Sequence, residues 1–193
     1  TTPKHNDVTQ ILYDAGYNSV SINSNKGQNG VLIASKLKEQ PVYIHGLPRE
    51  DPAKQEARHM SATWNEPRLT VCAPYKPFNN AEVEGREAYL KEFHKIFMLE
   101  MTDLLRGAVA RNRDVIIAGD MQVALTNLDQ TDNTKPESAG STTLERRQHT
   151  ELLQLGLRDA YRVLHPQGRD YTAHSTYAGW TKNSDNSMVE KRI

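Results

Sequence analysis

The stretch that decides the fold is Val115-Ile116-Ile117-Ala118-Gly119-Asp120-Met121-Gln122-Val123. It opens with small or β-branched apolar residues that follow the charged stretch 111–114, which predicts a strand covered on both faces of a sheet. Gly119 then lets the backbone turn, and Asp120 and Gln122, two residues apart in an extended chain, point to the same side. Polar side chains at the carboxyl end of a central strand are typical of sites in layered α/β enzymes. An aspartate that only caps the following turn would give the same local sequence.

Composition limits the class of protein. The 193 residues are enough for one domain with a sizeable core, and no stretch resembles an inter-domain linker, so we predict a single domain over residues 1–193. The chain has 24 basic and 24 acidic side chains, so any binding of DNA must use a local patch rather than a global basic field. The single cysteine, Cys72, excludes an intramolecular disulfide and a multi-cysteine zinc site.

The sequence gives no sign of a membrane protein. No apolar run approaches the roughly 20 residues that cross a bilayer. The polar start Thr1–His5 does not resemble a signal sequence. We therefore expect no membrane partner and an intracellular location, either nuclear or cytoplasmic.

Hydrophobic spacing predicts alternating strands and helices. The expected strands are Tyr17–Asn23, Gly30–Ser35, Val42–Ile44, Arg58–Trp64 and Arg68–Ala73. The first two are separated by the Asn/Gly-rich turn 25–29 and are expected to form a hairpin, and the last two are expected to pair antiparallel. The expected helices are a short one around Val8–Ala15 with Asn6 as its cap and Gly16 as its end, a long one over Glu84–Leu105, and one that starts at the Thr142/Glu145 capping box and ends at Gly156. Residues 161–177 mix aromatic residues with Ser, Thr and His and show little periodicity. This alternation predicts a layered α/β domain.

Several separated motifs agree with one family. They are Tyr75-Lys76-Pro77 after a strand, the Gly119–Val123 run, Ser138-Ala139-Gly140-Ser141-Thr142-Thr143-Leu144-Glu145-Arg146-Arg147, the stretch Asp159–Pro166, and Tyr171-Thr172. In order and spacing they resemble the exonuclease III and apurinic/apyrimidinic (AP) endonuclease branch of the endonuclease/exonuclease/phosphatase family. That branch reads roughly Gly-Asp-Phe-Asn-Val-Ala, then Ala-Gly-Phe-Thr-x-x-Glu-Arg, then Asp-x-Phe-Arg-x-x-x-Pro and Tyr-Thr. The match spans about residues 30–172, with a weaker echo at Glu190–Ile193.

The resemblance implies both a fold and an activity. The fold is the DNase I-like four-layer α/β sandwich, in which two mixed sheets pack face to face between flanking helices. The activity is magnesium-dependent hydrolysis of DNA phosphodiesters, as in a DNA-repair endonuclease or the endonuclease domain of a retrotransposon-like mobile element. Magnesium is the implied cofactor and DNA the implied partner.

The resemblance also implies three catalytic residues. Asp120 matches the aspartate that orients or deprotonates the attacking water. Gln122 stands where the family has an asparagine that contacts the phosphate, and its extra methylene would move the amide by more than about 1 Å, which can cost about a hundredfold in rate. Tyr75 matches the active-site tyrosine whose hydroxyl reaches the phosphate, although an aromatic residue at a strand end is common without such a role.

Four further residues are expected on the substrate side. Arg58 and Arg86 match positions that touch the DNA backbone, which suits the forked donors of arginine. His174 lies where the family lines its nucleotide pocket, and Ser138 begins the helix-start run. Each could instead be an ordinary surface residue.

The family motifs beyond each end lead to a further expectation. The metal-binding glutamate of a Gln-Glu-Thr motif would precede Thr1, and the final Asp-His would follow Ile193, so the fold is expected to be incomplete at both ends. We therefore expect no tight magnesium site formed by this chain alone. Two alternatives stay open: a catalytically impaired member that serves as a binding or scaffold module, and a non-nuclease phosphatase of the same superfamily.

Overall fold

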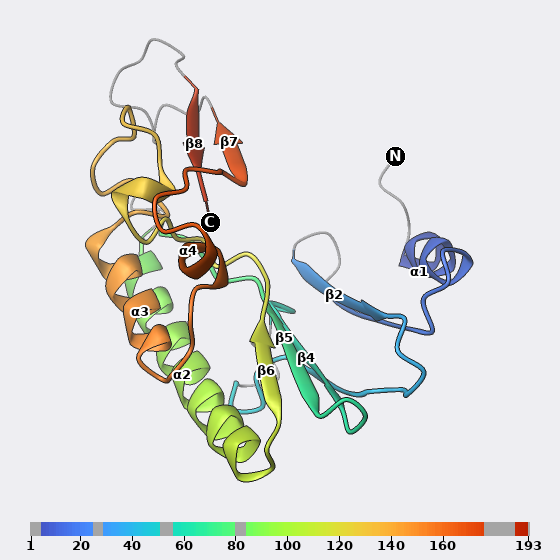
Figure 1. Ribbon diagram of the computed structural model, residues 1–193. Coiled ribbons are helices and arrows are strands. Elements are labelled where there is room, and N and C mark those ends of the chain that lie inside the picture. Colours follow the sequence, from blue (N-terminus) through green and yellow to red (C-terminus); the bar gives the residue numbers. More distant parts are fainter. Residues whose placement is uncertain (1–4, 25–28, 51–55, 80–83, 176–187, 193) are drawn as a thin grey trace. The chain divides into compact units, whose positions relative to one another are not determined.

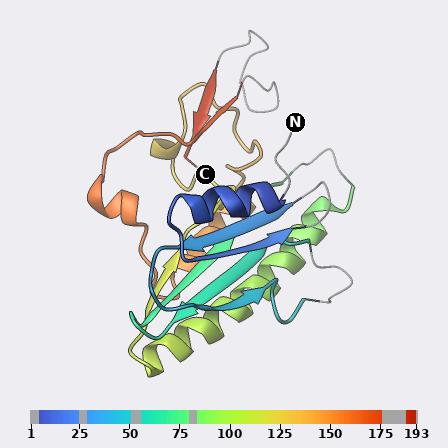
Figure 2. The same ribbon diagram turned by 90° about the vertical axis from the view of Figure 1, so that its right-hand side faces the viewer.

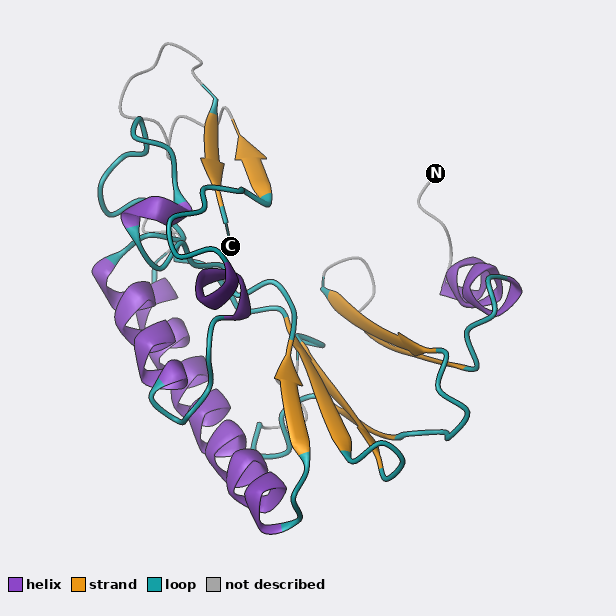
Figure 3. Ribbon diagram, in the orientation of Figure 1, coloured by secondary structure: helices purple, strands orange, loops and turns teal. Residues whose placement is uncertain are grey.

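The computed structural model describes residues 5–24, 29–50, 56–79, 84–175 and 188–192 (Figures 1 and 3). By its internal contacts the chain divides into two compact units, which we call the first unit (residues 1–76 and 99–120) and the second unit (residues 77–98 and 121–193). The organisation as a single domain stays a prediction. No helix among the described residues is long and apolar enough to span a membrane.

The first unit begins with a helix and a hairpin. Helix α1 (His5–Asp14) is followed by Gly16 in the left-handed conformation, with φ of 83°, which confirms the predicted end. The helix starts at His5, so Asn6 lies inside it and is not its cap. Strands β1 (Ser19–Ser24) and β2 (Gly30–Ser35) then pair antiparallel, as the sequence predicted.

A four-stranded mixed sheet forms the centre of the first unit. Its strands are β3 (Val42–His45), β4 (His59–Trp64), β5 (Leu69–Pro74) and β6 (Asp114–Ile117), in that order. The first three are antiparallel, whereas β5 and β6 are parallel and are connected through helix α2 (Arg86–Ala110). Because β5 and β6 run in the same direction, their carboxyl ends lie at the same end of the sheet, and the candidate site described below is at this end.

The hairpin packs on one face of this sheet. Strand β2 lies against β4 and β5 (Figure 2). The side chain of its Ile33 belongs to a buried cluster with those of Met60, Ala62, Trp64 and Ala73. Two layers of strands therefore lie face to face in the first unit, as expected for a sandwich.

The prediction that Val115–Ala118 is a central strand buried on both faces was wrong. Among the described strands, β6 is the edge of its sheet, and Ile116 is 50% exposed. The apolar run is equally consistent with an edge strand, because its composition does not say how many neighbours pair with it.

The second unit combines helices with a short hairpin. Its elements are the first part of α2 (residues 86–98), the 3-10 helix η2 (Asn127–Asp129), α3 (Thr143–Leu153), α4 (Ala160–Leu164), and the antiparallel strands β7 (Ala173–Ser175) and β8 (Val189–Lys191). The predicted capping box is confirmed: Thr142 accepts from the backbone N–H of Glu145, whose carboxylate accepts in return from the backbone N–H of Thr142.

The stretch 161–177, which shows little periodicity in the sequence, contains regular structure. Helix α4, capped by Asp159, and strand β7 lie within it. Neither is long enough to show a hydrophobic period, and β7 is fixed by pairing with β8, about 16 residues away in sequence.

Candidate active site

Asp120 and Tyr75 are neighbours just beyond the carboxyl ends of β6 and β5. The two residues form a parallel bridge, and the backbone N–H of Lys76 donates to the carbonyl oxygen of Asp120 at 2.9 Å. The parallel pairing of β5 and β6 is thus extended past Pro74 and Ile117. The first unit therefore brings together two of the three residues that the sequence predicted as catalytic.

Gly119 makes this close approach possible. A Cβ atom at this position would lie 2.1 Å from the carbonyl oxygen of Pro74, and backbone atoms cannot move aside cheaply. Only a residue without a side chain lets the chain pass this close to β5 on its way to Asp120. The glycine of the Gly-Asp motif is thus explained by backbone packing.

Arg58, which directly precedes β4, lies beside Tyr75 and is the third residue of this group. Its carbonyl oxygen accepts from the backbone N–H of Tyr75 at 2.7 Å, and its guanidinium lies 5.0 Å from the centre of the Tyr75 ring. The Arg58 Nε donates to a carboxylate oxygen of Glu56 at 2.7 Å, and the Arg58 side chain is 11% exposed. The guanidinium is therefore held against the tyrosine ring and suited to fixing its orientation.

Acidic groups lie close to Arg58. Burial raises the pKa of Glu50 above its ordinary value, the negative charge of Glu56 raises it further, and Arg58 opposes the rise. Among the described residues, no group of three or more His, Cys, Asp or Glu side chains is arranged to hold a metal ion.

Gln122 does not share an extended strand with Asp120. Strand β6 ends at Ile117, and Gln122 has a φ of 54°, in the left-handed region. The argument from alternating side chains therefore fails at this residue, because it assumes an extended backbone. Gln122 belongs to the second unit, and its part in the site stays a prediction.

The other three candidates lie in the second unit and have local partners. The Arg86 guanidinium donates to the carbonyl oxygen of Phe78 at 2.9 Å and stacks over Phe78 and Tyr89. The buried Ser138 hydroxyl lies 3.0 Å from the Ser141 hydroxyl. The exposed ring of His174 is 2.8 Å from a carboxylate oxygen of Glu190. Their roles toward a substrate stay predictions, and burial leaves Ser138 the least accessible.

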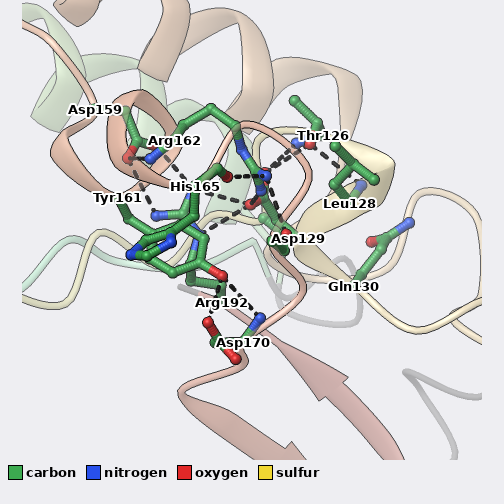
Figure 4. Close-up of polar contacts among 12 residues, drawn as sticks. Thr126, Leu128, Asp129, Gln130, Asp159, Tyr161, Arg162, His165, Asp170 and Arg192 are labelled. Carbon is green, nitrogen blue, oxygen red and sulfur yellow. Dashed lines mark hydrogen bonds and ion pairs between the residues drawn. The ribbon is translucent and has the colours of Figure 1, made fainter.

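Sequence reasoning missed a buried ionic network in the second unit (Figure 4). One carboxylate oxygen of Asp129 accepts from Arg162 at 2.6 Å and from Arg192 at 2.9 Å, and the other accepts from the backbone N–H and hydroxyl of Thr126 at 2.8 Å each. Arg192 also donates to Asp159 at 2.7 Å. The Thr126/Asp129 capping box was the one local signal that could have indicated it.

The charge state of Asp129 follows from these contacts. Burial alone would raise the pKa of Asp129, but the hydrogen bonds from Thr126, Arg162 and Arg192 together hold it below its ordinary value. The network therefore contains an ionised carboxylate between two guanidinium groups, and it ties η2, α4 and the end of β8 together.

Lys191 is a second buried charge that the sequence did not indicate. Its ammonium donates to the Ser138 hydroxyl at 2.9 Å and to the Ala139 carbonyl oxygen at 2.7 Å, and the residue is 0% exposed. Burial lowers the pKa of Lys191 to about 8, although the charge of Glu145 opposes this. The lysine anchors β8 to the loop that precedes α3.

Comparison with solved structures relates this architecture to known enzymes. No protein-family model matches the chain, and no curated protein matches it. An AP endonuclease from Archaeoglobus fulgidus is 24% identical, with a TM-score of 0.72, over 94% of this chain and 69% of that one. The 3' phosphatase NExo from Neisseria, bound to a product DNA hairpin, is 21% identical with the same TM-score and coverage. The AP endonuclease LMAP from Leishmania major is 17% identical, with a TM-score of 0.66, over 82% of this chain and 55% of that one.

These likenesses agree with the mixed sheet and the face-to-face strand layers described above. The chain has the α/β fold of the exonuclease III-like and AP endonuclease-like proteins.

Proposed function

We propose that this chain belongs to a DNA-acting phosphodiesterase, an endonuclease or exonuclease whose catalytic carboxylate is Asp120. The observation that supports the proposal most is that Tyr75 lies beside both Asp120 and Arg58, just beyond the carboxyl ends of β5 and β6. Support also comes from solved structures of the same fold, which include AP endonucleases and a 3' phosphatase bound to product DNA.

Each residue has a chemical role in this proposal. Hydrolysis of a phosphodiester needs a base that accepts a proton from the attacking water, and we assign that role to the Asp120 carboxylate. The Tyr75 hydroxyl would donate to a phosphate oxygen and hold the scissile group in place. Arg58 acts as a positioning residue, because its guanidinium lies over the Tyr75 ring and is fixed by Glu56.

Magnesium enters only as a requirement of the complete site. The ion is usually held by one or two carboxylates together with waters and substrate phosphate, and Asp120 supplies one. The described residues do not supply the rest, so no step here is assigned to the metal. DNA is the proposed partner, bound by a local surface because the net charge of the chain is zero.

The proposal is tested by nicking assays on abasic and intact duplexes with the protein that carries this chain. Tyr75→Phe should lower kcat by about tenfold or more, because it removes one donor to the phosphate. Tyr17→Phe is the matched control and should leave the rate unchanged, since the Tyr17 ring contacts Lys36 on another part of the first unit. Equal rates for wild type and Tyr75→Phe would remove the tyrosine from the mechanism.

Gln122→Asn tests the departure from the family motif. If the longer side chain misplaces its amide, the shorter residue should raise the rate of cleavage. A protein that binds DNA but cleaves neither duplex, even with this change, would support the alternative of a binding or scaffold module.

A further inference from the structure

An exposed aromatic ring in the second unit has an arginine side chain against it. Phe78 is 39% exposed, whereas the other two phenylalanines of the chain, Phe93 and Phe97, are buried at 5% and 0% exposed. A single exposed apolar side chain is common on protein surfaces and needs no function by itself. Phe78 differs because the guanidinium of Arg86 lies 5.6 Å from the centre of its ring. The two side chains form one surface feature within the second unit, which we call the Phe78/Arg86 platform.

The arginine of this platform is held in place. Its Nε donates to the Phe78 carbonyl oxygen at 2.9 Å, and its guanidinium also lies 5.0 Å from the centre of the Tyr89 ring. These contacts restrict the rotamers of a long side chain, so less conformational freedom is lost when the guanidinium binds a ligand.

The positive charge of Arg86 has no counter-charge nearby. Among the described residues no carboxylate forms an ion pair with it, and its two terminal NH2 groups have no hydrogen-bond acceptor there. In contrast, Arg58 and Arg192 each pair with a carboxylate at 2.7 Å. Free donors on a guanidinium fork suit the oxygens of a phosphate. The platform therefore combines an exposed ring with a group that can bind one phosphate.

A nucleotide carries both of the groups that would bind there. Bases stack on aromatic rings and on guanidinium planes, and the phosphate beside the base can bind the guanidinium donors. In a paired duplex the faces of each base are covered by its neighbours, so the platform suits a base that is unpaired or displaced from the stack. DNA is favoured over a protein partner, because Phe78 follows Tyr75 of the proposed site by three residues in the sequence.

We propose that the Phe78/Arg86 platform binds one unpaired nucleotide of the DNA, with its base stacked on Phe78 and its phosphate bound by Arg86. The inference rests on the proposed function for the choice of DNA and goes beyond it by assigning Phe78 as a residue that contacts bases. It implies that Phe78 contributes to binding only where the DNA presents an unstacked base.

The test measures binding of labelled oligothymidylate by the protein that carries this chain, using fluorescence anisotropy with EDTA present to suppress metal-dependent cleavage. An oligomer of the same length built only of abasic sites is the comparator, because it keeps the phosphates and lacks the bases. Phe78→Leu should weaken binding of oligothymidylate by about tenfold, the usual loss for one stacked base, and leave binding of the abasic oligomer within about twofold. Phe78→Trp keeps a ring and should bind oligothymidylate within about twofold of wild type.

Arg86→Met separates the phosphate contact from the stacking contact. It should weaken binding of both oligomers and lower the slope of log affinity against log salt concentration by about 0.7, the value for one phosphate on a single strand. Phe78→Leu should leave this slope unchanged. The control Tyr13→Leu removes an aromatic side chain that is 46% exposed on α1, and it should change neither affinity.

Three results would overturn the inference. They are equal binding of oligothymidylate by wild type and Phe78→Leu, an equal loss by Phe78→Leu on both oligomers, and no binding of oligothymidylate by wild type. Nicking of an abasic duplex, measured in parallel with Mg²⁺, tests the proposed function separately. A wild type that nicks DNA while Phe78→Leu binds oligothymidylate normally would refute the platform alone, and a wild type that does not nick would refute the proposed function whatever the binding result.

Discussion

Replacing Asp129 by asparagine should destabilise the second unit strongly. The carboxylate is 1% exposed and accepts from Arg162, Arg192 and Thr126 through both of its oxygens. Asparagine has one oxygen, so in either orientation its NH2 group faces donors that the carboxylate had satisfied. Two mostly buried guanidinium groups would also lose their shared counter-charge.

The size of the effect follows from these losses. Removing one partner of a buried ion pair typically costs about 3–5 kcal/mol. We therefore expect Asp129→Asn to lower the free energy of unfolding by about 3 kcal/mol or more, which corresponds to a fall in Tm of roughly 6–12 °C for a chain of this length. Urea and thermal unfolding followed by far-UV circular dichroism at pH 7 would measure it.

The matched control is Asp132→Asn. The Asp132 side chain is 90% exposed and pairs with Arg169 at the surface at 3.3 Å, so the substitution should change the free energy of unfolding by less than about 1 kcal/mol. The stability difference between wild type and Asp129→Asn should persist above about pH 4 and shrink at lower pH, because the folded-state pKa of Asp129 lies below that of the unfolded chain. A loss below about 1 kcal/mol for Asp129→Asn at pH 7 would refute the reasoning.

Three further predictions follow from other parts of the chain. Gly119→Ala should lower the free energy of unfolding, measured in urea, by about 1–3 kcal/mol, because the added Cβ would overlap the Pro74 carbonyl oxygen. The control Gly107→Ala should be neutral or stabilising, because its Cβ would meet only the flexible end of a side chain. Between pH 8 and pH 10.5, the free energy of unfolding of wild type should rise by roughly 3 kcal/mol relative to that of Lys191→Met. The reason is that the folded-state pKa of Lys191, about 8, lies below its unfolded value, so the lysine loses its charge in this range and the neutral amine is easier to bury. Parallel curves of unfolding free energy against pH for the two proteins would contradict this. Without nucleic acid, the chain should bind Mg²⁺ more weakly than micromolar in calorimetric titration, since Asp120 supplies a single carboxylate, and micromolar affinity would show that further ligands are present.

Much of the fold could be predicted from local sequence. The hairpin of β1 and β2, the pairing of β4 with β5, and the capping box at Thr142 all depend on short-range patterns, and each was confirmed. Asp120 and Tyr75, two of the predicted catalytic residues, are bridged by their backbones just beyond two predicted strands, and their catalytic roles stay predictions.

The parts that failed depend on information that is not local. Gln122 has a left-handed backbone, and in a residue other than glycine this conformation has no sequence signal. The exposure of Ile116 depends on which other parts of the fold pack beside β6. The Thr126/Asp129 capping box is a local pattern, but Arg162 and Arg192 lie more than 30 positions from Asp129, so no spacing rule could reveal that they pair with it. Single charged residues such as Lys191 are usually solvated, and only the fold shows that this one is buried.

The central claim is that Asp120 is the catalytic carboxylate of a DNA-cleaving site. The most direct test measures Mg²⁺-dependent nicking of abasic and intact duplex DNA by the protein that carries this chain, as wild type, Asp120→Asn and the control Asp114→Asn, which alters an exposed carboxylate at the start of the same strand. We expect wild type and Asp114→Asn to cleave at similar rates. Asp120→Asn should be slower by about a hundredfold or more, because a carboxamide cannot accept the proton of the attacking water. Full activity in Asp120→Asn would contradict the claim.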